Sequence, residues 1–338
     1  MRVVFFGTPE FAVPSLARLL AEPDLTVVGV VTQPDQRRGR GSQVDASPVK
    51  HLGLQAGCPI LQPQRINRDQ ASLKSLVDFQ ADVFVVVAYG QILSQTVLAI
   101  PRWGCINGHG SLLPAYRGAA PIQRCIVQGE TLTGMTIMQM NRGMDTGDML
   151  LKSFLPIGLL DNFVDVAGAL AHQCADLLVA TLAGLEAQTL TPEPQDQALA
   201  SYAPPIHKDE YGLDWSRPAI ALHNQIRGLY PHCVTSLRGQ PLKVLATAPL
   251  LHPYWQALPP ELAALEPLTA NLVSTAPAGT LVGLLKGHGP VVQTGEGPLL
   301  LRQVKPSGKQ VQRGADFING SRLQLGEQLG LASTDLTP

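Results

Sequence analysis

The chain has 338 residues, 45% of them hydrophobic, and a formal net charge of −1. This length is enough for two domains with sizeable cores, and the near-neutral charge excludes binding of nucleic acid by bulk charge alone. Five cysteines without a CxxC pair fit neither a disulfide framework nor a zinc ribbon and favour a reducing compartment. No signal peptide is expected, and no uninterrupted apolar run approaches the roughly 20 residues of a membrane helix, so we expect a soluble, cytoplasmic protein.

The first half of the chain alternates strand patterns with helix patterns, which is typical of a parallel sheet with helices on both faces. Near-continuous runs of Val and Phe predict buried strands at residues 3–6, 27–32 and 83–88. A further short strand is expected at 105–107. Helices are expected at 14–21, 47–56 and 69–79, with Asn67 as the candidate N-cap of the last.

After the fourth strand, the pattern predicts a helix at 119–128, a strand pair at 133–140 and 149–156, and a long helix at 162–187. Residues 189–207 are rich in Pro and polar side chains and are expected to be a linker between domains 1–188 and 208–338. A helix at 218–229 is followed by short, Gly-punctuated strand patterns, which predict a smaller β-barrel of OB type. Residues 254–279 are expected to form a long loop. The predicted fold class is α/β, a Rossmann-like, mostly parallel sheet followed by this barrel.

The first strand is followed by Gly7, Thr8 and Pro9, where a dinucleotide-binding fold would have a GxGxxG motif. The second and third glycines of that motif are missing, which favours a tight turn from strand to helix over a phosphate-binding loop. Neither NAD nor ATP is predicted.

Asn107 and His109 lie two residues apart, so on an extended segment both side chains would point to one face. Asp145, in the turn Asp-Thr-Gly-Asp, could bring a carboxylate to the imidazole, and no serine nucleophile or set of metal ligands accompanies them. Together, an amide donor, an imidazole and a carboxylate are suited to catalyse the transfer of an acyl group to an amine. The alternatives are a structural, hydrogen-bonded histidine and an aspartate that only caps its own turn.

Several motifs together resemble the methionyl-tRNA formyltransferases, a family that uses 10-formyltetrahydrofolate. They include Gly7–Ala12 (GTPEFA), the residues 107–114 (NGHGSLLP), 117–123 (RGAAPIQ) and 145–148 (DTGD), and, in the second half, 223–227 (HNQIR) and 316–320 (DFING). The motif around Asn107 is shared with other folate-dependent enzymes, such as glycinamide ribonucleotide formyltransferase. The second half distinguishes the tRNA family from these.

The resemblance implies transfer of a formyl group from 10-formyltetrahydrofolate to the α-amine of methionyl initiator tRNA, by a formyltransferase domain and a tRNA-binding barrel. Asn107, His109 and Asp145 would be catalytic, and no metal is implied. The folate would be bound by the segments Tyr89, Gly90, Gln91 and Ser111, Leu112, Leu113, Pro114, together with Asp148. The basic loop with Arg37, Arg38 and Arg40 would contact tRNA.

The chain departs from the family at Gly108, where relatives usually have a branched apolar residue, and at Ser42 and Gln43, where they usually have lysines. We expect Gly108 to loosen the end of its strand. Two other functions remain open: a folate-dependent formyltransferase that acts on a small amine, such as a nucleotide or an amino sugar, and a catalytically silent RNA-binding protein. A monomer is expected.

Overall fold

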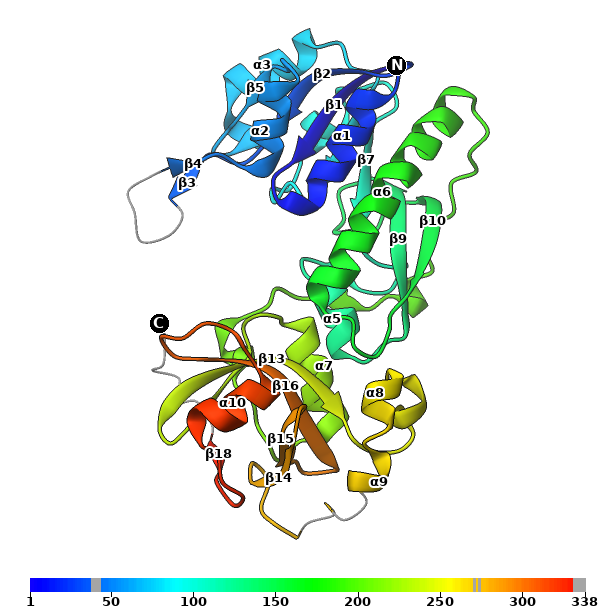
Figure 1. Cartoon of the computed structure of the whole chain (residues 1–338). Helices are drawn as coiled ribbons and strands as arrows, with labels where there is room; N and C mark the ends of the chain where they lie inside the picture. The colour runs from blue at the N-terminus through cyan, green and yellow to red at the C-terminus, as the bar shows by residue number, and fades with distance from the viewer. Residues whose placement is uncertain (38–43, 270–271, 273–274, 331–338) are drawn as a thin grey trace. The chain divides into compact units, whose positions relative to one another are not determined.

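The computed structural model describes residues 1–37, 44–269, 272 and 275–330, and its contacts divide the chain into two compact units (Figure 1). The first unit contains described residues within 1–121, 133–155 and 167–204, and the second contains 122–132, 156–166 and those from 205 onward. Two short segments of the first predicted domain, 122–132 and 156–166, therefore pack with the second unit. Most of the predicted linker packs with the first unit. The domain boundaries at 188 and 207 remain predictions.

A mostly parallel sheet forms the centre of the first unit. Its strands are β1 (Arg2–Gly7), β2 (Thr26–Val31), β5 (Ile60–Leu61), β6 (Val83–Val87), β7 (Cys105–His109), β9 (Leu132–Gln139) and β10 (Met149–Pro156). The described strands are ordered β10-β9-β7-β6-β1-β2-β5. The pairs from β7 to β5 are parallel, and β9 runs antiparallel to β7. The predicted α/β class with a mostly parallel sheet is confirmed.

Helices cover both faces of this sheet. On one face, Leu76 of α3 (Gln70–Asp78) and Val97 of α4 (Gln95–Leu98) join a cluster with Phe6 and Phe84 of the strands. On the other face lie α1 (Val13–Ala21) and α6 (Phe163–Glu186), which are joined by an ion pair between Arg18 and Asp176. Further elements are η1 (Glu10–Ala12), α2 (Pro48–Gln55), η2 (Ile66–Arg68), η3 (Gln197–Leu199) and the two-stranded pairs β3 (Gln36–Arg37) with β4 (Val44–Asp45) and β8 (Arg117–Gly118) with β11 (Tyr202–Ala203).

The expected cap of α3 was wrong. Asp69, not Asn67, accepts a hydrogen bond from the backbone N–H of Ser72 at 2.9 Å. A 3-10 turn over Ile66–Arg68 precedes the helix, so Asn67 lies two residues before the actual cap. Its amide instead donates to the carbonyl of Ile92 at 2.7 Å, and its oxygen accepts from the N–H of Ser94 at 2.8 Å.

Gly108 does not loosen the end of β7. The strand continues to His109, and Gly108 is paired with Ile137 of β9. A β-carbon at Gly108 would lie 2.5 Å from the sulfur of Cys174, because this fully buried side chain of α6 packs directly onto the glycine. A branched residue at 108 would therefore collide with Cys174, and the thiol fills the space that a larger side chain would occupy.

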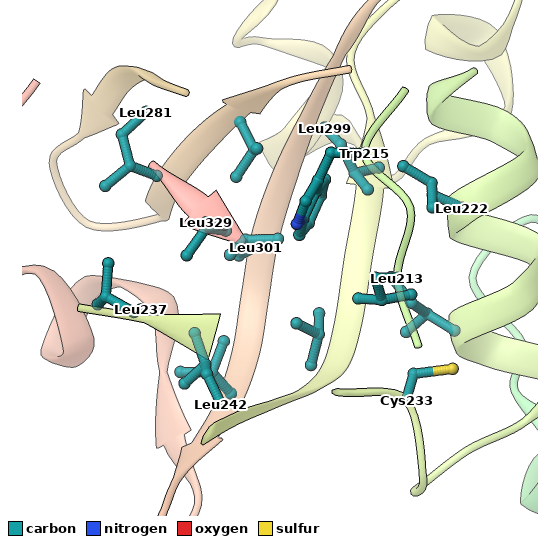
Figure 2. Packing of buried hydrophobic residues seen from close by; sticks show 14 of the residues in the cluster. Leu213, Trp215, Leu222, Cys233, Leu237, Leu242, Leu281, Leu299, Leu301 and Leu329 are labelled. Carbon is teal, nitrogen blue, oxygen red and sulfur yellow. The ribbon is translucent and has the colours of Figure 1, made fainter. Parts of the chain in front are cut away.

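The second unit is built on an antiparallel sheet. Its strands are β12 (Val234–Leu237), β13 (Gln240–Pro249), β14 (Leu281–Leu285), β15 (Gly289–Gln293), β16 (Pro298–Pro306), β17 (Gln312–Arg313) and β18 (Leu329–Gly330). The described order is β14-β15-β16-β13-β12-β18, with β17 on β16. The core of this unit surrounds Trp215, which lies among Leu222, Leu299 and Leu301 (Figure 2). Its indole N–H donates to the hydroxyl of Thr235 at 3.0 Å, so the buried polar atom is satisfied.

The helices of the second unit are α5 (Pro121–Val127), η4 (Lys208–Tyr211), α7 (Ala219–Gly228), η5 (Tyr254–Ala257), α8 (Pro260–Ala263), α9 (Glu266–Thr269) and α10 (Gly314–Ser321). The expected loop at 254–279 was wrong in its first half. Trp255, Leu258, Leu262 and Leu265 are buried against Leu300 of the sheet, and these apolar side chains anchor three short helical turns. Frequent prolines hide this spacing in the sequence.

One described helix, α6, is long and apolar enough to cross a membrane by length and composition alone, and 44% of the tested window is buried. Its side chains contact the sheet of the first unit: Gln173 accepts a hydrogen bond from Ser153 at 2.9 Å, and Cys174 packs on Gly108. Core helices of soluble proteins pass the same test, so the feature is weak evidence for a membrane span.

We predict that His223 makes the stability of the protein depend on pH. In its neutral form this buried histidine donates from Nε2 to the carbonyl of Leu159 and accepts at Nδ1 from the hydroxyl of Thr247. Burial lowers its pKa from 6.5 to about 4. Between these pH values the histidine of the unfolded chain binds a proton that the folded chain does not bind. The free energy of unfolding is therefore highest above pH 6.5 and falls as the pH falls, by on the order of 3 kcal/mol at most.

Denaturant unfolding of the wild type and of His223→Gln between pH 7 and pH 4 measures this effect. We expect the variant to be less stable at pH 7 but to lose less stability on acidification, whereas the exposed His172→Ala behaves like the wild type. An unchanged pH dependence in His223→Gln would contradict the assignment.

We also predict that Gly108→Ala destabilises the protein by about 1–3 kcal/mol, because the new methyl group would overlap the Cys174 sulfur. In a Cys174→Gly background the same substitution should cost much less, since the space is open. Urea midpoints of the four chains measure the coupling. Equal losses in both backgrounds would show that the two residues do not compete for one space.

Candidate active site

Asn107 and His109 lie at the carboxyl end of β7. Residues on a strand alternate between faces, so both side chains point away from the face on which Gly108 meets Cys174. His109 is only 5% exposed, whereas the Asn107 side chain is half-buried. Among the described residues, the Asn107 amide has no hydrogen-bond partner, so its N–H groups are available to a ligand oxygen.

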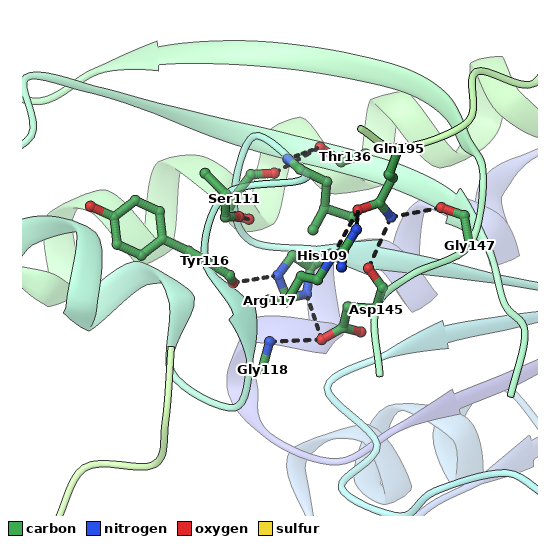
Figure 3. A network of polar contacts seen from close by, with 11 residues as sticks. His109, Ser111, Tyr116, Arg117, Gly118, Thr136, Asp145, Gly147 and Gln195 are labelled. Atoms are coloured by element: carbon green, nitrogen blue, oxygen red, sulfur yellow. Dashed lines mark hydrogen bonds and ion pairs between the residues drawn. The ribbon is translucent and has the colours of Figure 1, made fainter. Parts of the chain in front are cut away.

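His109 is held between two groups (Figure 3). Its Nε2 lies 2.9 Å from the carbonyl oxygen of Tyr116, and its Nδ1 lies 3.7 Å from a carboxylate oxygen of Asp145. A carbonyl can only accept, so Nε2 carries a proton and, in the neutral ring, Nδ1 presents its lone pair on the Asp145 side. The predicted pairing of His109 with Asp145 is therefore present in the structure.

One short backbone segment connects His109 and Asp145. It consists of Tyr116, Arg117 and Gly118 and is here called the 116–118 segment. The carbonyl of Tyr116 binds His109, while the N–H of Gly118 donates to Asp145 at 2.8 Å. Gly118 has φ +122°, and a β-carbon there would lie 2.7 Å from the carbonyl oxygen of Ala203, so this position requires glycine.

The 116–118 segment forms hydrogen bonds with residues of the predicted linker. Ser201 accepts the N–H of Tyr116 at its hydroxyl, at 2.9 Å, and the N–H of Arg117 at its carbonyl, at 2.8 Å. Ala203 accepts the N–H of Ala119 at 2.9 Å. The segment around Ser201 is therefore part of the site's support.

Gln195 was missed by the sequence reasoning because it lies in a Pro-rich, polar stretch. Its side-chain nitrogen donates to the carbonyls of Asp145, at 2.9 Å, and Gly147, at 2.7 Å. Its oxygen accepts two hydrogen bonds from Arg117, which is 1% exposed. Asp145 has φ +53°, so its turn is in a conformation that non-glycine residues adopt rarely, and Gln195 hydrogen-bonds it there.

Residues 111–114 form a turn that begins directly after β7. The carbonyl of Ser111 and the N–H of Leu113 both bind the hydroxyl of Thr136, at 2.7 and 3.1 Å. The Ser111 hydroxyl donates to the carbonyl of Ala115, and Leu113 is buried. Leu112 and Pro114 remain half-buried. The turn is thus rigid and adjacent to His109.

Tyr89, Gly90 and Gln91 follow β6, the strand next to β7, so both segments lie at the same edge of the sheet. The ring of Tyr89 is packed in the core against Phe6, and burial raises the pKa of its hydroxyl. The ring is therefore not available to a ligand, whereas the backbone at Gly90 is exposed. The side-chain amide of Gln91 already accepts a hydrogen bond from the N–H of Ile66 and donates to the carbonyl of Pro63. Asp148 is exposed, and its carbonyl binds Gln139 of β9.

Arg38 and Arg40 lie outside the described residues, and Arg37 belongs to the short strand β3. Within the described chain, no group of three His, Cys, Asp or Glu residues could hold a metal ion. Burial raises the pKa of Cys105, two residues before Asn107, to about 12, so this thiol is neutral and does not serve as a nucleophile.

Comparison with known proteins identifies the family of the chain. The formyl transferase family matches residues 1–182, and its C-terminal domain matches residues 205–322. The chain is 58% identical to methionyl-tRNA formyltransferase of Cyanothece sp., over 98% of this chain and 100% of that protein. It is 52% identical to methionyl-tRNA formyltransferase of Thermosynechococcus vestitus, over 99% and 100% of the two chains.

Among solved structures, the fold is similar to an N-formyltransferase from Helicobacter canadensis determined with folinic acid and dTDP-3-aminofucose. The TM-score is 0.60 at 16% identity, over 88% of this chain and 98% of the other. At this identity the likeness concerns the fold alone. The full-length matches at more than half identity are decisive, and the chain belongs to the methionyl-tRNA formyltransferase family.

Proposed function

We propose that the chain transfers a formyl group from 10-formyltetrahydrofolate to the α-amine of methionyl initiator tRNA, in the cytoplasm. The observation that carries the chemistry is the amide of Asn107, which has no hydrogen-bond partner among the described residues, beside the His109–Asp145 pair at the carboxyl end of β7. The relatives that match the whole chain support the acceptor, because they are named for methionyl-tRNA.

In the proposed reaction, the amine nitrogen bonds to the formyl carbon and the bond from that carbon to N10 of the folate breaks. Asn107 donates its amide to the formyl oxygen as this oxygen gains negative charge. His109 accepts a proton from the attacking amine at Nδ1 and returns it to N10 as the leaving group departs. Asp145 stabilises the imidazolium during this transfer, and no covalent enzyme intermediate is needed.

The folate fits between the turn Ser111–Pro114 and the segment Tyr89–Gln91. Both follow neighbouring parallel strands, and ligands bind at this edge of open α/β sheets. Gly90, with φ +89°, exposes backbone there, and the exposed carboxylate of Asp148 lies after β9. Residues 112–114 would lie against the reactive end of the folate.

The second unit, in this proposal, is an OB-like barrel that contacts tRNA. Hydrogen bonds from Leu281 to Glu327 and from Leu329 to Gly279 join the first and last strands of the antiparallel sheet, which supports closure. Together with this unit, Arg37, Arg38 and Arg40 supply positive charge for the phosphates of the acceptor. A formyltransferase for small amines has no need of the arginine loop, and a silent RNA-binding protein needs no Asn107, His109 and Asp145.

We predict that Asn107→Ala, His109→Ala and Asp145→Ala each lower kcat for formylation of methionyl-tRNA about 100-fold or more, because each removes a group that acts on the reacting atoms. Formylmethionine released from the tRNA measures the product. His172→Ala, on the exposed face of α6, is the matched control and should keep wild-type turnover. Near-wild-type rates for any two of the three variants would refute the mechanism, and formylation of a small amine in place of methionyl-tRNA by the wild type would refute the acceptor.

We further predict that Arg40→Ala raises the KM for tRNA several-fold without changing the KM for the folate, because the loop would meet the tRNA backbone. The salt dependence of kcat/KM should weaken as well, since one phosphate contact is lost. Arg68→Ala, an exposed arginine on η2, is the control. An unaltered tRNA dependence in Arg40→Ala would remove this loop from the recognition surface.

A further inference from the structure

We infer that Arg117 and Gln195 are positioning residues for Asp145, an inference that rests on the proposed function. Neither residue contacts the reacting atoms in that proposal. They act on the turn that presents the carboxylate, and their side-chain hydrogen bonds form a relay with a fixed direction from Arg117 through Gln195 to the backbone at Asp145 and Gly147 (Figure 3).

The orientation of the Gln195 amide is determined by its partners. Its oxygen accepts from both Nε and an Nη of Arg117, at 2.9 and 2.7 Å, and a guanidinium can only donate. The side-chain nitrogen of Gln195 therefore points toward the loop that contains Asp145. There it donates to the two carbonyls on either side of Thr146. A flipped amide would leave the donors of Arg117 facing N–H groups, at a buried site where unsatisfied polar groups are costly.

A second hydrogen bond also connects β8, the strand that contains Arg117, to Asp145. Gly118, next to Arg117, donates its backbone N–H to the carboxylate at 2.8 Å. The backbone of Asp145 and its side chain are thus both fixed from β8, one through Gln195 and one directly. Since the carboxylate lies 3.7 Å from His109, a small rotation of the turn changes the distance on which the proton transfer depends.

Gln195→Glu separates positioning from simple packing. The glutamate keeps the size of the side chain and can pair with Arg117, but its carboxylate has no N–H for the carbonyls of Asp145 and Gly147 and would repel them. We expect kcat to fall about 10- to 100-fold, with the KM for methionyl-tRNA and for the folate changed less than threefold. Arg117→Lys should lower kcat less, because one ammonium can still donate to Gln195.

Gln197→Ala is the matched control. Gln197 also accepts a hydrogen bond from Arg117, at 2.8 Å, but it contacts neither carbonyl of the turn. This variant should keep kcat within about twofold of the wild type. If Gln197→Ala and Gln195→Glu lowered kcat equally, the effect would belong to the environment of Arg117 and the relay would be refuted.

The decisive test is the combination with Asp145→Ala. If Gln195 acts through Asp145, Gln195→Glu should change the rate less than twofold in the Asp145→Ala background, although it costs at least 10-fold in the wild type. Equal losses in both backgrounds would overturn the positioning role. If instead the wild type formed no formylmethionine on the tRNA, the proposed function would fail, so the two failures are distinguishable.

Discussion

The site depends on one constraint: His109 and Asp145, which come from different strands and loops, are both held by the three consecutive residues 116–118. The carbonyl of Tyr116 fixes the imidazole, and the N–H of Gly118 fixes the carboxylate. Because both contacts are made by one short backbone segment, the distance between the two side chains is set by local geometry. This segment is in turn paired with residues around Ser201, some 85 residues later in the chain. The polar stretch after α6 is therefore part of the first unit and supports the candidate active site.

The two faces of β7 have separate tasks. Asn107 and His109 face the candidate active site, while Gly108 faces α6 and contacts the buried sulfur of Cys174. A larger residue at 108 would push on the strand that carries both functional side chains. The contact between Gly108 and Cys174 thus keeps β7 regular, although the sequence had suggested that Gly108 would loosen the end of this strand. Stability on one face and geometry on the other are coupled through a strand of five residues.

The sequence was sufficient to predict the parallel sheet and the proximity of His109 to Asp145, because continuous Val and Phe runs and adjacent polar motifs are local signals. It was not sufficient for Gln195 and Ser201, since their importance comes from hydrogen bonds to residues far away in the chain. Trp255 and Leu262 were likewise taken for loop residues, because prolines interrupt the helical spacing that buries them. The cap of α3 was misplaced by two residues, because a 3-10 turn precedes the helix.

The central claim is that His109 and Asp145 act as one proton-accepting unit. It is tested most directly by the single-turnover rate of formyl transfer to methionyl-tRNA in a cycle of His109→Ala, Asp145→Ala and the double variant. The account predicts strong non-additivity, with the double variant no slower than the slower single variant by more than about threefold. Losses that multiply in the double variant would show that the two residues act independently and would contradict it.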